Sequence, residues 1–203
     1  PDQERLDNYI EAVLDQRPNG YWKLDEMEGA QASDSSGNGN HGTYRDNPRL
    51  GVPGRVGKAA NMNGTGFVVT PVGQNDIWTS GTAGTVTAIV KLPAEFRNWG
   101  TRPYQSKEHI WSNWAYWQGT SIGTINGVSG VHFWSFYNGS NEYRVSIPAT
   151  AGSWVHVAWV YRGNRFCGYV NGRESCTAAP LPIQRGSNRA FHIGHFHQAP
   201  NRY

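Results

Sequence analysis

The chain has 203 residues, 37% of them hydrophobic, with 25 glycines and 11 prolines, which suits one domain with a sizeable core and many turns. No apolar run approaches the roughly 18 residues of a membrane-spanning helix, so we do not expect the chain to insert into a membrane. The formal net charge is +3, and the 11 basic residues of positions 77–203, which outnumber 4 acids there, are scattered singly rather than clustered as in a nucleic-acid footprint.

The start of the chain shows apolar residues at helical spacing. Asp2 is a suitable N-cap, and Arg17-Pro18 ends the pattern. We expect an amphipathic helix of about three turns. Residues 1–18 are therefore assigned to this helix and a linker, and residues 19–203 to the main domain. The apolar positions are Leu6, Tyr9, Ile10, Val13 and Leu14.

Residues 20–25 are predicted to form the first strand, and two acids follow it. Glu26 and Glu28 stand two positions apart, a spacing that places both carboxylates on one face of a strand. Retaining hydrolysis of a glycoside needs two carboxyl groups about 5 Å apart around a sugar cleft. Because the acids beyond Asp76 are isolated in the sequence, we expect no enzymatic activity.

The loop DSSGNGN, residues 34–40, places side-chain oxygens at alternate positions, as the start of an EF-hand loop does. Position twelve is Arg45 instead of the bidentate Glu, so the loop is not an EF-hand. Two interpretations remain open: a structural calcium site with a charged aspartate ligand, or a Gly/Asn turn held by Asx hydrogen bonds. The candidate calcium ligands are Asp34, Ser36, Asn38 and Asn40.

The following stretch predicts turns and three short strands. A Gly/Pro turn is expected at 51–54, and strands are expected at 58–63, 66–71 and 85–92.

Between Trp99 and Tyr137 the chain is rich in aromatic residues. A sandwich has two buried faces, so some of them belong to the core. The loop aromatics stand beside amide and guanidinium groups, a mixture typical of surfaces that bind sugars or proteins. We interpret them as a ligand or partner face, with structural packing of a long loop as the alternative. The candidate residues are Trp99, Arg102, Tyr104, Asn113, Trp114, Trp117 and Gln118.

Residues 153–176 contain two β-type runs. The run 154–161 is apolar at successive positions, which predicts a central strand covered on both faces. Further along, Asn171-Gly172 is the preferred pair for a two-residue hairpin turn. That turn places Val170 opposite Arg173 and fixes the register of the whole hairpin.

Counting outward from this turn, Cys167 lies opposite Cys176, and the chain has 2 cysteines. The position is a non-hydrogen-bonded pair, at which the Cα atoms are about 4.5 Å apart. A disulfide accepts that separation. We therefore predict a Cys167–Cys176 bond; the alternative is two reduced thiols that are neighbours.

Several of these motifs carry a family resemblance. They are the hairpin WVHVAWVYRGNRFCGYVNGRE, the opening YIEAVLDQRPNGYWKLDEMEG with DSSGNGNHGTY, and GVPGRVGKAANMNG, TVTAIVKLP and FHIGHF in that order. Together they resemble the laminin-G-like jelly rolls of the concanavalin A-like lectin/glucanase superfamily over nearly the whole chain. The resemblance implies an all-β fold, a two-sheet antiparallel jelly-roll sandwich with a short N-terminal helix.

The resemblance also bears on the calcium hypothesis and on the end of the chain. Related jelly rolls sometimes hold a structural calcium ion near the 34–40 loop. In the family, the strand that corresponds to residues 191–194 is usually followed by a final strand, which the sequence up to Tyr203 does not contain. We expect the sheet to be completed by a longer parent chain, by a strand donated from a neighbour, or by the N-terminal segment.

These motifs identify a fold more specifically than a function. We expect a non-catalytic binding or adhesion module at an extracellular, cell-surface or virion-surface location, with glycan as its ligand. One alternative is a purely structural module of a phage tail, capsid surface or fibre that contacts neighbouring subunits, and another is an accessory domain of a glycoside hydrolase. The one cofactor that the sequence suggests is structural Ca2+.

Overall fold

The computed structural model describes residues 2–73, 83–103, 106, 108–113, 118–137, 141–179 and 190–194. Within this part of the chain, no helix is long and apolar enough to cross a membrane. The elements are α1 (Asp2–Asp15), β1 (Gln31–Ala32), β2 (Gly42–Arg45), β3 (Arg49–Pro53), β4 (Lys58–Asn61), β5 (Phe67–Gly73), β6 (Ala83–Lys91), β7 (His109–Asn113), β8 (Gln118–Ile125), β9 (Val128–Tyr137), β10 (Asn141–Pro148), β11 (Trp154–Arg162), β12 (Arg165–Val170), β13 (Arg173–Ala178) and β14 (Ala190–Gly194).

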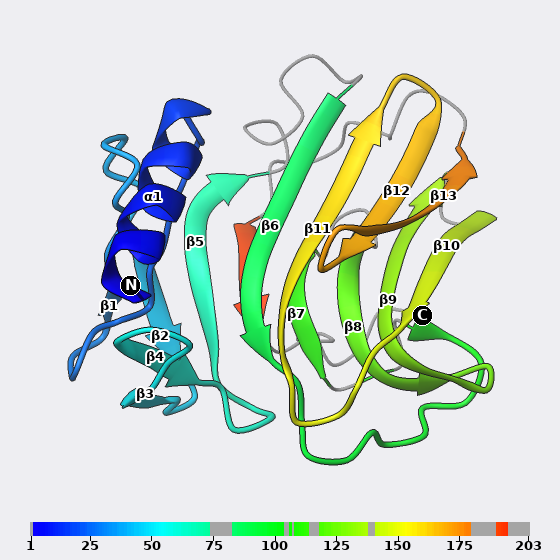
Figure 1. Ribbon diagram of the computed structural model, residues 1–203, viewed down its shortest axis with the longest axis horizontal. Coiled ribbons are helices and arrows are strands. Elements are labelled where there is room, and N and C mark those ends of the chain that lie inside the picture. The colour runs from blue at the N-terminus through cyan, green and yellow to red at the C-terminus, as the bar shows by residue number, and fades with distance from the viewer. Residues whose placement is uncertain are drawn as a thin grey trace.

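Most strands belong to two antiparallel sheets that pack face to face (Figure 1). The larger sheet has 8 strands in the order β1-β2-β5-β14-β7-β8-β9-β10, and the smaller has 4 in the order β13-β12-β11-β6. The strands β3 and β4 form a separate pair. This arrangement is a jelly-roll β-sandwich with one short helix, and it confirms the predicted fold class.

The main hydrophobic core fills the space between the two sheets. Trp111 of the larger sheet meets Trp159 of the smaller edge to face, with ring centroids 5.6 Å apart. Phe133 reaches so far across the sandwich that a Cβ atom on Gly168 would collide with its ring. Position 168 therefore requires glycine because the Phe133 ring occupies the space that a side chain would need.

The predicted hairpin is present with the predicted register. Val170 pairs with Arg173, and Cys167 pairs with Cys176. The two cysteines form a disulfide with a Cα–Cα distance of 4.1 Å. The predicted central strand is β11, which lies between β6 and β12. The turn thus determined the pairing, as inferred from the sequence.

The strand predicted at residues 20–25 is not formed. This segment makes a single isolated bridge, between Trp22 and Asp34. Leu24 has a left-handed backbone with φ of 57°, which interrupts an extended chain. In addition, the N–H of Tyr21 donates to the side chain of Asp34 rather than to a neighbouring strand. Local side-chain hydrogen bonds therefore replace a ladder here.

The predicted turn at 51–54 is mostly strand. Residues Arg49–Pro53 form β3 and pair with β4. Gly51 has φ of 65°, and the register shifts between Arg49 and Val52. Gly51 therefore marks an irregularity inside a strand rather than a chain reversal.

The last described strand and the helix complete the sandwich. β14 lies inside the larger sheet, hydrogen-bonded to β5 on one side and to β7 on the other. Helix α1 contacts the outer face of the smaller sheet through Tyr9, whose ring meets that of His156 edge to face at 6.1 Å. The predicted helix is thus formed and packs on the sandwich.

Replacing both cysteines, as Cys167→Ala with Cys176→Ala, is expected to lower the free energy of unfolding by roughly 2 to 3 kcal/mol. The bond joins residues 9 positions apart and removes loop entropy from the unfolded chain. Urea unfolding followed by tryptophan fluorescence measures the change, and the reduced native protein serves as a control without substitutions. Alkylation of both cysteines in the unreduced, denatured protein would contradict the bond.

Candidate functional site

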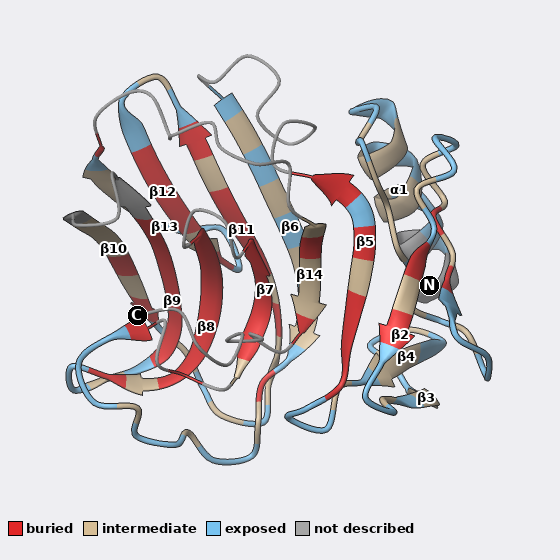
Figure 2. Ribbon diagram, turned by 180° about the vertical axis from the view of Figure 1, so that it is seen from behind, coloured by how far each residue is buried: buried red, intermediate tan, exposed pale blue. Residues whose placement is uncertain are grey.

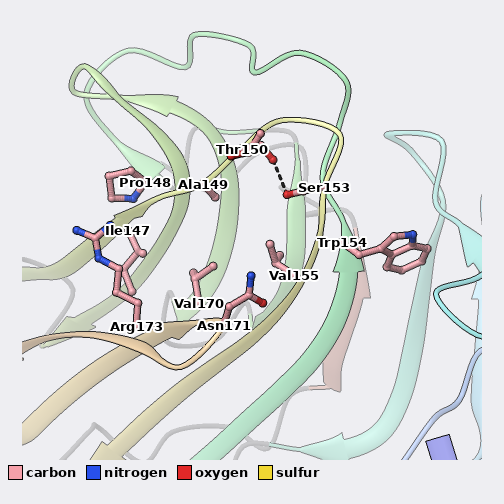
Figure 3. A pocket seen from close by; sticks show the side chains of 10 residues that line it. All are labelled: Ile147, Pro148, Ala149, Thr150, Ser153, Trp154, Val155, Val170, Asn171 and Arg173. Carbon is pink, nitrogen blue, oxygen red and sulfur yellow. Dashed lines mark hydrogen bonds between the residues drawn. The ribbon is translucent and has the colours of Figure 1, made fainter. Parts of the chain in front are cut away.

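A groove opens at the end of the sandwich where β10 ends and β11 begins (Figure 3). Its volume is about 300 Å³, at the lower end of the range of small-molecule sites. The end of β10 with its following loop, the start of β11, and the turn between β12 and β13 line it. The lining residues are Ile147, Pro148, Ala149, Thr150, Ser153, Trp154, Val155, Val170, Asn171 and Arg173.

The floor of the groove is apolar. Ile147, Val155 and Val170 belong to the main core, and they are only 1%, 4% and 6% exposed. Pro148 stands at the rim and is exposed. The ring of Trp154 points away from the other lining side chains (Figure 3). The groove is thus the end of the hydrophobic core, open to solvent on one side.

The Asn171-Gly172 turn positions the first polar group of the rim. Both residues have left-handed backbones, with φ of 48° and 80°. The backbone N–H of Asn171 donates to the His156 carbonyl at 2.8 Å, and the side-chain Oδ1 of Asn171 accepts from the backbone N–H of His156 at 2.8 Å. These two bonds fix the turn against β11 and leave the Asn171 side-chain NH2 as a donor at the groove.

Hydroxyl groups supply the other side of the rim. The Ser153 hydroxyl donates to the Thr150 carbonyl at 2.6 Å, so its oxygen remains an acceptor (Figure 3). Thr150 is exposed and adds a second hydroxyl. With the guanidinium of Arg173, the groove offers donors and acceptors above an apolar floor. It offers no Asp, Glu, His or Cys, so its lining supplies no carboxylate, imidazole or thiol to act as a general acid or as a metal ligand.

Two of the predicted ligand residues, Trp99 and Arg102, lie in a segment that crosses the outer face of the larger sheet. The backbone N–H of Trp99 donates to the Thr124 carbonyl at 2.9 Å. Its ring occupies the space above Gly123, where a Cβ atom would collide with the indole. Arg102 is exposed. Neither residue lines the groove, and the contacts of Trp99 match the alternative of structural packing.

The outer face below this segment is polar but largely buried, as the burial colours of β7, β8 and β9 show (Figure 2). The Trp134 indole N–H donates to Ser121 Oγ at 2.7 Å, and the Ser121 hydroxyl donates to the Pro103 carbonyl at 2.9 Å. His132 has hydrogen-bond partners at both ring nitrogens. The Ser121–Pro103 bond ties the crossing segment to the sheet, and the other bonds link neighbouring strands of the sheet.

Asn113 and Gln118 lie opposite each other at the end of the β7–β8 pair. They are 1% and 0% exposed, and alternation from Trp111 puts both on the inner face of the sheet, at the end of the sandwich away from the groove. Among the described residues, neither polar atom of the Gln118 amide has a hydrogen-bond partner. The other predicted ligand residues, Tyr104, Trp114 and Trp117, lie outside the described residues. The ligand role of this set stays a prediction.

The 34–40 loop is organised around the carboxylate of Asp34. Its Oδ1 accepts from the Tyr21 and Ser36 N–H groups at 2.8 and 2.9 Å. Its Oδ2 accepts from the Ser36 hydroxyl and the Asn40 N–H at 2.7 and 2.9 Å. The Asn38 amide donates to the Pro18 carbonyl. Both Asp34 oxygens and the Ser36 hydroxyl thus accept donors from within the loop, as the Asx-stabilised turn requires. The calcium interpretation of the four residues stays a prediction.

The same hydrogen bonds set the ionisation of Asp34. Burial by itself raises the pKa of this carboxyl, but the donors from Tyr21, Ser36 and Asn40 stabilise the charged form and hold its pKa below the usual value. The carboxylate is therefore a structural anion at neutral pH.

The groove residues were not predicted as a site. Asn171 and Arg173 flank a turn that the sequence reveals, so their closeness follows from the register. The approach of Pro148 and Thr150 to that turn is a long-range contact between the two sheets, for which the sequence carries no local signal.

Comparisons with known proteins support the fold. No protein-family model matches the chain, and no curated protein matches it. Among solved structures, the chain is similar to domain 4 of AbnA, an extracellular GH43 arabinanase from Geobacillus stearothermophilus, in complex with arabinotriose. The TM-score is 0.59 and the sequence identity is 20%, and the match covers 83% of this chain and 80% of that one. The Bacillus licheniformis β-glucanase matches with a TM-score of 0.38 and 14% identity, over 87% and 74%. The first likeness shows a shared β-sandwich.

Substituting Asp34→Ala is expected to lower the free energy of unfolding by about 2 to 4 kcal/mol, because it removes charge-assisted hydrogen bonds to a buried carboxylate. The folded pKa is depressed, so this contribution is present above the ordinary aspartate pKa of about 3.9 and is lost as the pH falls through the folded value. Urea unfolding at several pH values measures both effects. The exposed Asp25→Ala is the control, and a rise in Tm of the wild type with added calcium would favour the calcium interpretation of the loop instead.

Substituting Gln118→Met is expected to raise the free energy of unfolding by about 1 kcal/mol. The substitution replaces a buried amide that has no hydrogen-bond partner among the described residues with an apolar side chain of similar length. Urea unfolding measures the change, with the exposed Gln31→Met as the matched control. Destabilisation of Gln118→Met would show that the amide has a structural role that its contacts do not reveal.

Proposed function

We propose that this chain is a non-catalytic sugar-binding module that holds a sugar unit in the groove between residues 147–155 and 170–173. The observation that carries the proposal is the lining of that groove, an apolar floor with amide, hydroxyl and guanidinium groups around it. A sugar ring presents an apolar C–H face and a rim of hydroxyls that both donate and accept hydrogen bonds. The two surfaces are complementary.

The carboxylates of the described residues support binding rather than hydrolysis. The groove is lined by no Asp or Glu. On other segments, Glu108 lies 3.8 Å from Arg97, and Glu142 lies 3.6 Å from Arg144. Burial raises the pKa of both glutamates, and the adjacent arginines oppose that rise. A glycosidase needs two carboxyl groups facing one sugar, which these residues do not provide at the groove.

The setting that we propose is extracellular or on a cell or virion surface. The disulfide supports this, since such bonds persist in oxidising environments. The similar arabinanase domain is bound to arabinotriose, which makes arabino-oligosaccharides the first ligands to test and an accessory role beside a glycoside hydrolase one setting for the module.

The test compares Asn171→Gly with Asn126→Gly. Both asparagines occupy left-handed turn positions before a glycine, with φ of 48° and 51°, so glycine suits the backbone of both turns. Asn171→Gly loses the Oδ1 bond to His156 but keeps the backbone bond to the His156 carbonyl, and thermal unfolding checks that the variant is folded. Only Asn171 lines the groove. We screen the wild type on a glycan array that includes arabinotriose, then titrate the strongest hit by calorimetry. Asn171→Gly is expected to bind the sugar roughly three- to tenfold more weakly, which corresponds to the loss of one hydrogen bond. Asn126→Gly is expected to bind it as tightly as the wild type does.

Two results would contradict the proposal. Binding that is lost in Trp114→Ala or Trp117→Ala but unchanged in Asn171→Gly would move the site to the aromatic 114–117 segment. Absence of any array hit, together with concentration-dependent self-association in sedimentation, would favour the alternative of a structural module that contacts neighbouring subunits.

A further inference from the structure

We infer that Arg173 makes the groove selective for sugars that carry a carboxylate group. This inference rests on the proposed sugar-binding function and names the class of sugar. Arg173 is the single charged residue among the ten that line the groove. The groove thus has one positive charge and no negative charge to balance it.

The orientation of Arg173 follows from the hairpin register. Arg173 lies opposite Val170, whose side chain belongs to the core, so both point to the inner face of the smaller sheet. From there the Arg173 side chain extends along Ile147 and ends beside Pro148 (Figure 3). The guanidinium therefore stands at the rim, next to the apolar floor.

The nearest acid in the sequence does not neutralise this charge. Glu174 is the next residue of β13 and points to the opposite face of the sheet. There it accepts a hydrogen bond from the Tyr169 hydroxyl at 2.6 Å and lies 3.8 Å from Arg165. Within the described part of the chain, Arg173 itself takes part in no ion pair. Its guanidinium is available to a ligand.

The chemistry of the guanidinium selects the ligand group. Arginine presents a planar fork of N–H donors that matches the two oxygens of a carboxylate, and it is weakly hydrated, so it is readily desolvated beside apolar surface. A single arginine balances a single negative charge. A sugar ring packed on the apolar floor could place its carboxylate at Arg173 and its hydroxyls at Asn171 and Ser153. It would then contact the polar groups on each side of the groove. Uronic acid units have this pattern of groups.

The matched ligands are a galacturonic acid trimer and its methyl ester, which keeps the rings and the ring hydroxyls but loses the charge. The matched variants are Arg173→Gln and Arg55→Gln. Arg55 is exposed and lies in the turn between β3 and β4, strands that Figure 1 shows on the opposite side of the molecule from β10 and β13. Its loss changes the net charge by the same amount as the loss of Arg173. Arg173→Lys keeps the charge and removes the fork. Thermal unfolding confirms that each variant is folded.

Calorimetric titration is expected to show about tenfold tighter binding of the acid than of the ester, a preference that disappears in Arg173→Gln, shrinks in Arg173→Lys and persists in Arg55→Gln. The preference should also weaken at 1 M NaCl, because salt screens a charge pair at an exposed rim.

Equal binding of acid and ester, or a preference that survives in Arg173→Gln, would overturn this inference and leave the proposed sugar-binding function standing. If neither trimer binds while the array yields neutral sugars that depend on Asn171, the inference also fails alone. If no sugar of any class binds, both proposals fail together.

Discussion

The Asn171-Gly172 turn is the constraint on which this end of the molecule depends. Two consecutive left-handed residues close the hairpin with one register, and that register determines which side chains point inward. It brings Cys167 to Cys176, where a covalent bond secures the pairing. It also turns Val170 and Arg173 toward the interior, and it fixes Asn171 to His156 of the neighbouring strand. Fold, crosslink and groove therefore share one local cause.

The groove is continuous with the core, so the packing of the core holds its floor in place. Ile147, Val155 and Val170 are counted among the residues that hold the two sheets together, and they also form the floor. Their positions are fixed by the same packing that places Trp159 and Phe133 in the middle of the sandwich. A ligand that meets such a surface does not have to order it first, so little of the binding free energy is lost to reorganisation.

Local patterns predicted several elements of the fold, and the family resemblance predicted its class, but neither indicated the proposed groove. The helix, the hairpin register and the disulfide follow from periodicity and one turn, because each depends on residues close in sequence. The segment at 20–25 was wrongly predicted as a strand, since Asp34 captures the N–H of Tyr21 and Leu24 turns left-handed, and neither effect shows in the pattern of apolar residues. The groove joins β10 to the β12–β13 turn, a contact between sheets that no local pattern encodes. Of the predicted ligand residues, Trp99 packs over Gly123 and Gln118 is buried, and their ligand role stays a prediction.

The most direct test of the central claim is to map amide chemical shifts of the isotope-labelled protein during titration with arabinotriose and with the galacturonic acid trimer. If the groove is the sugar site, the amides of residues 149–155 and 170–173 shift together with a common saturation curve, and those of the β7–β8 pair at Asn113 and Gln118 stay unchanged. Saturable shifts confined to the Asn113 and Gln118 end of the sandwich, with the amides of residues 149–155 and 170–173 unchanged, would contradict it.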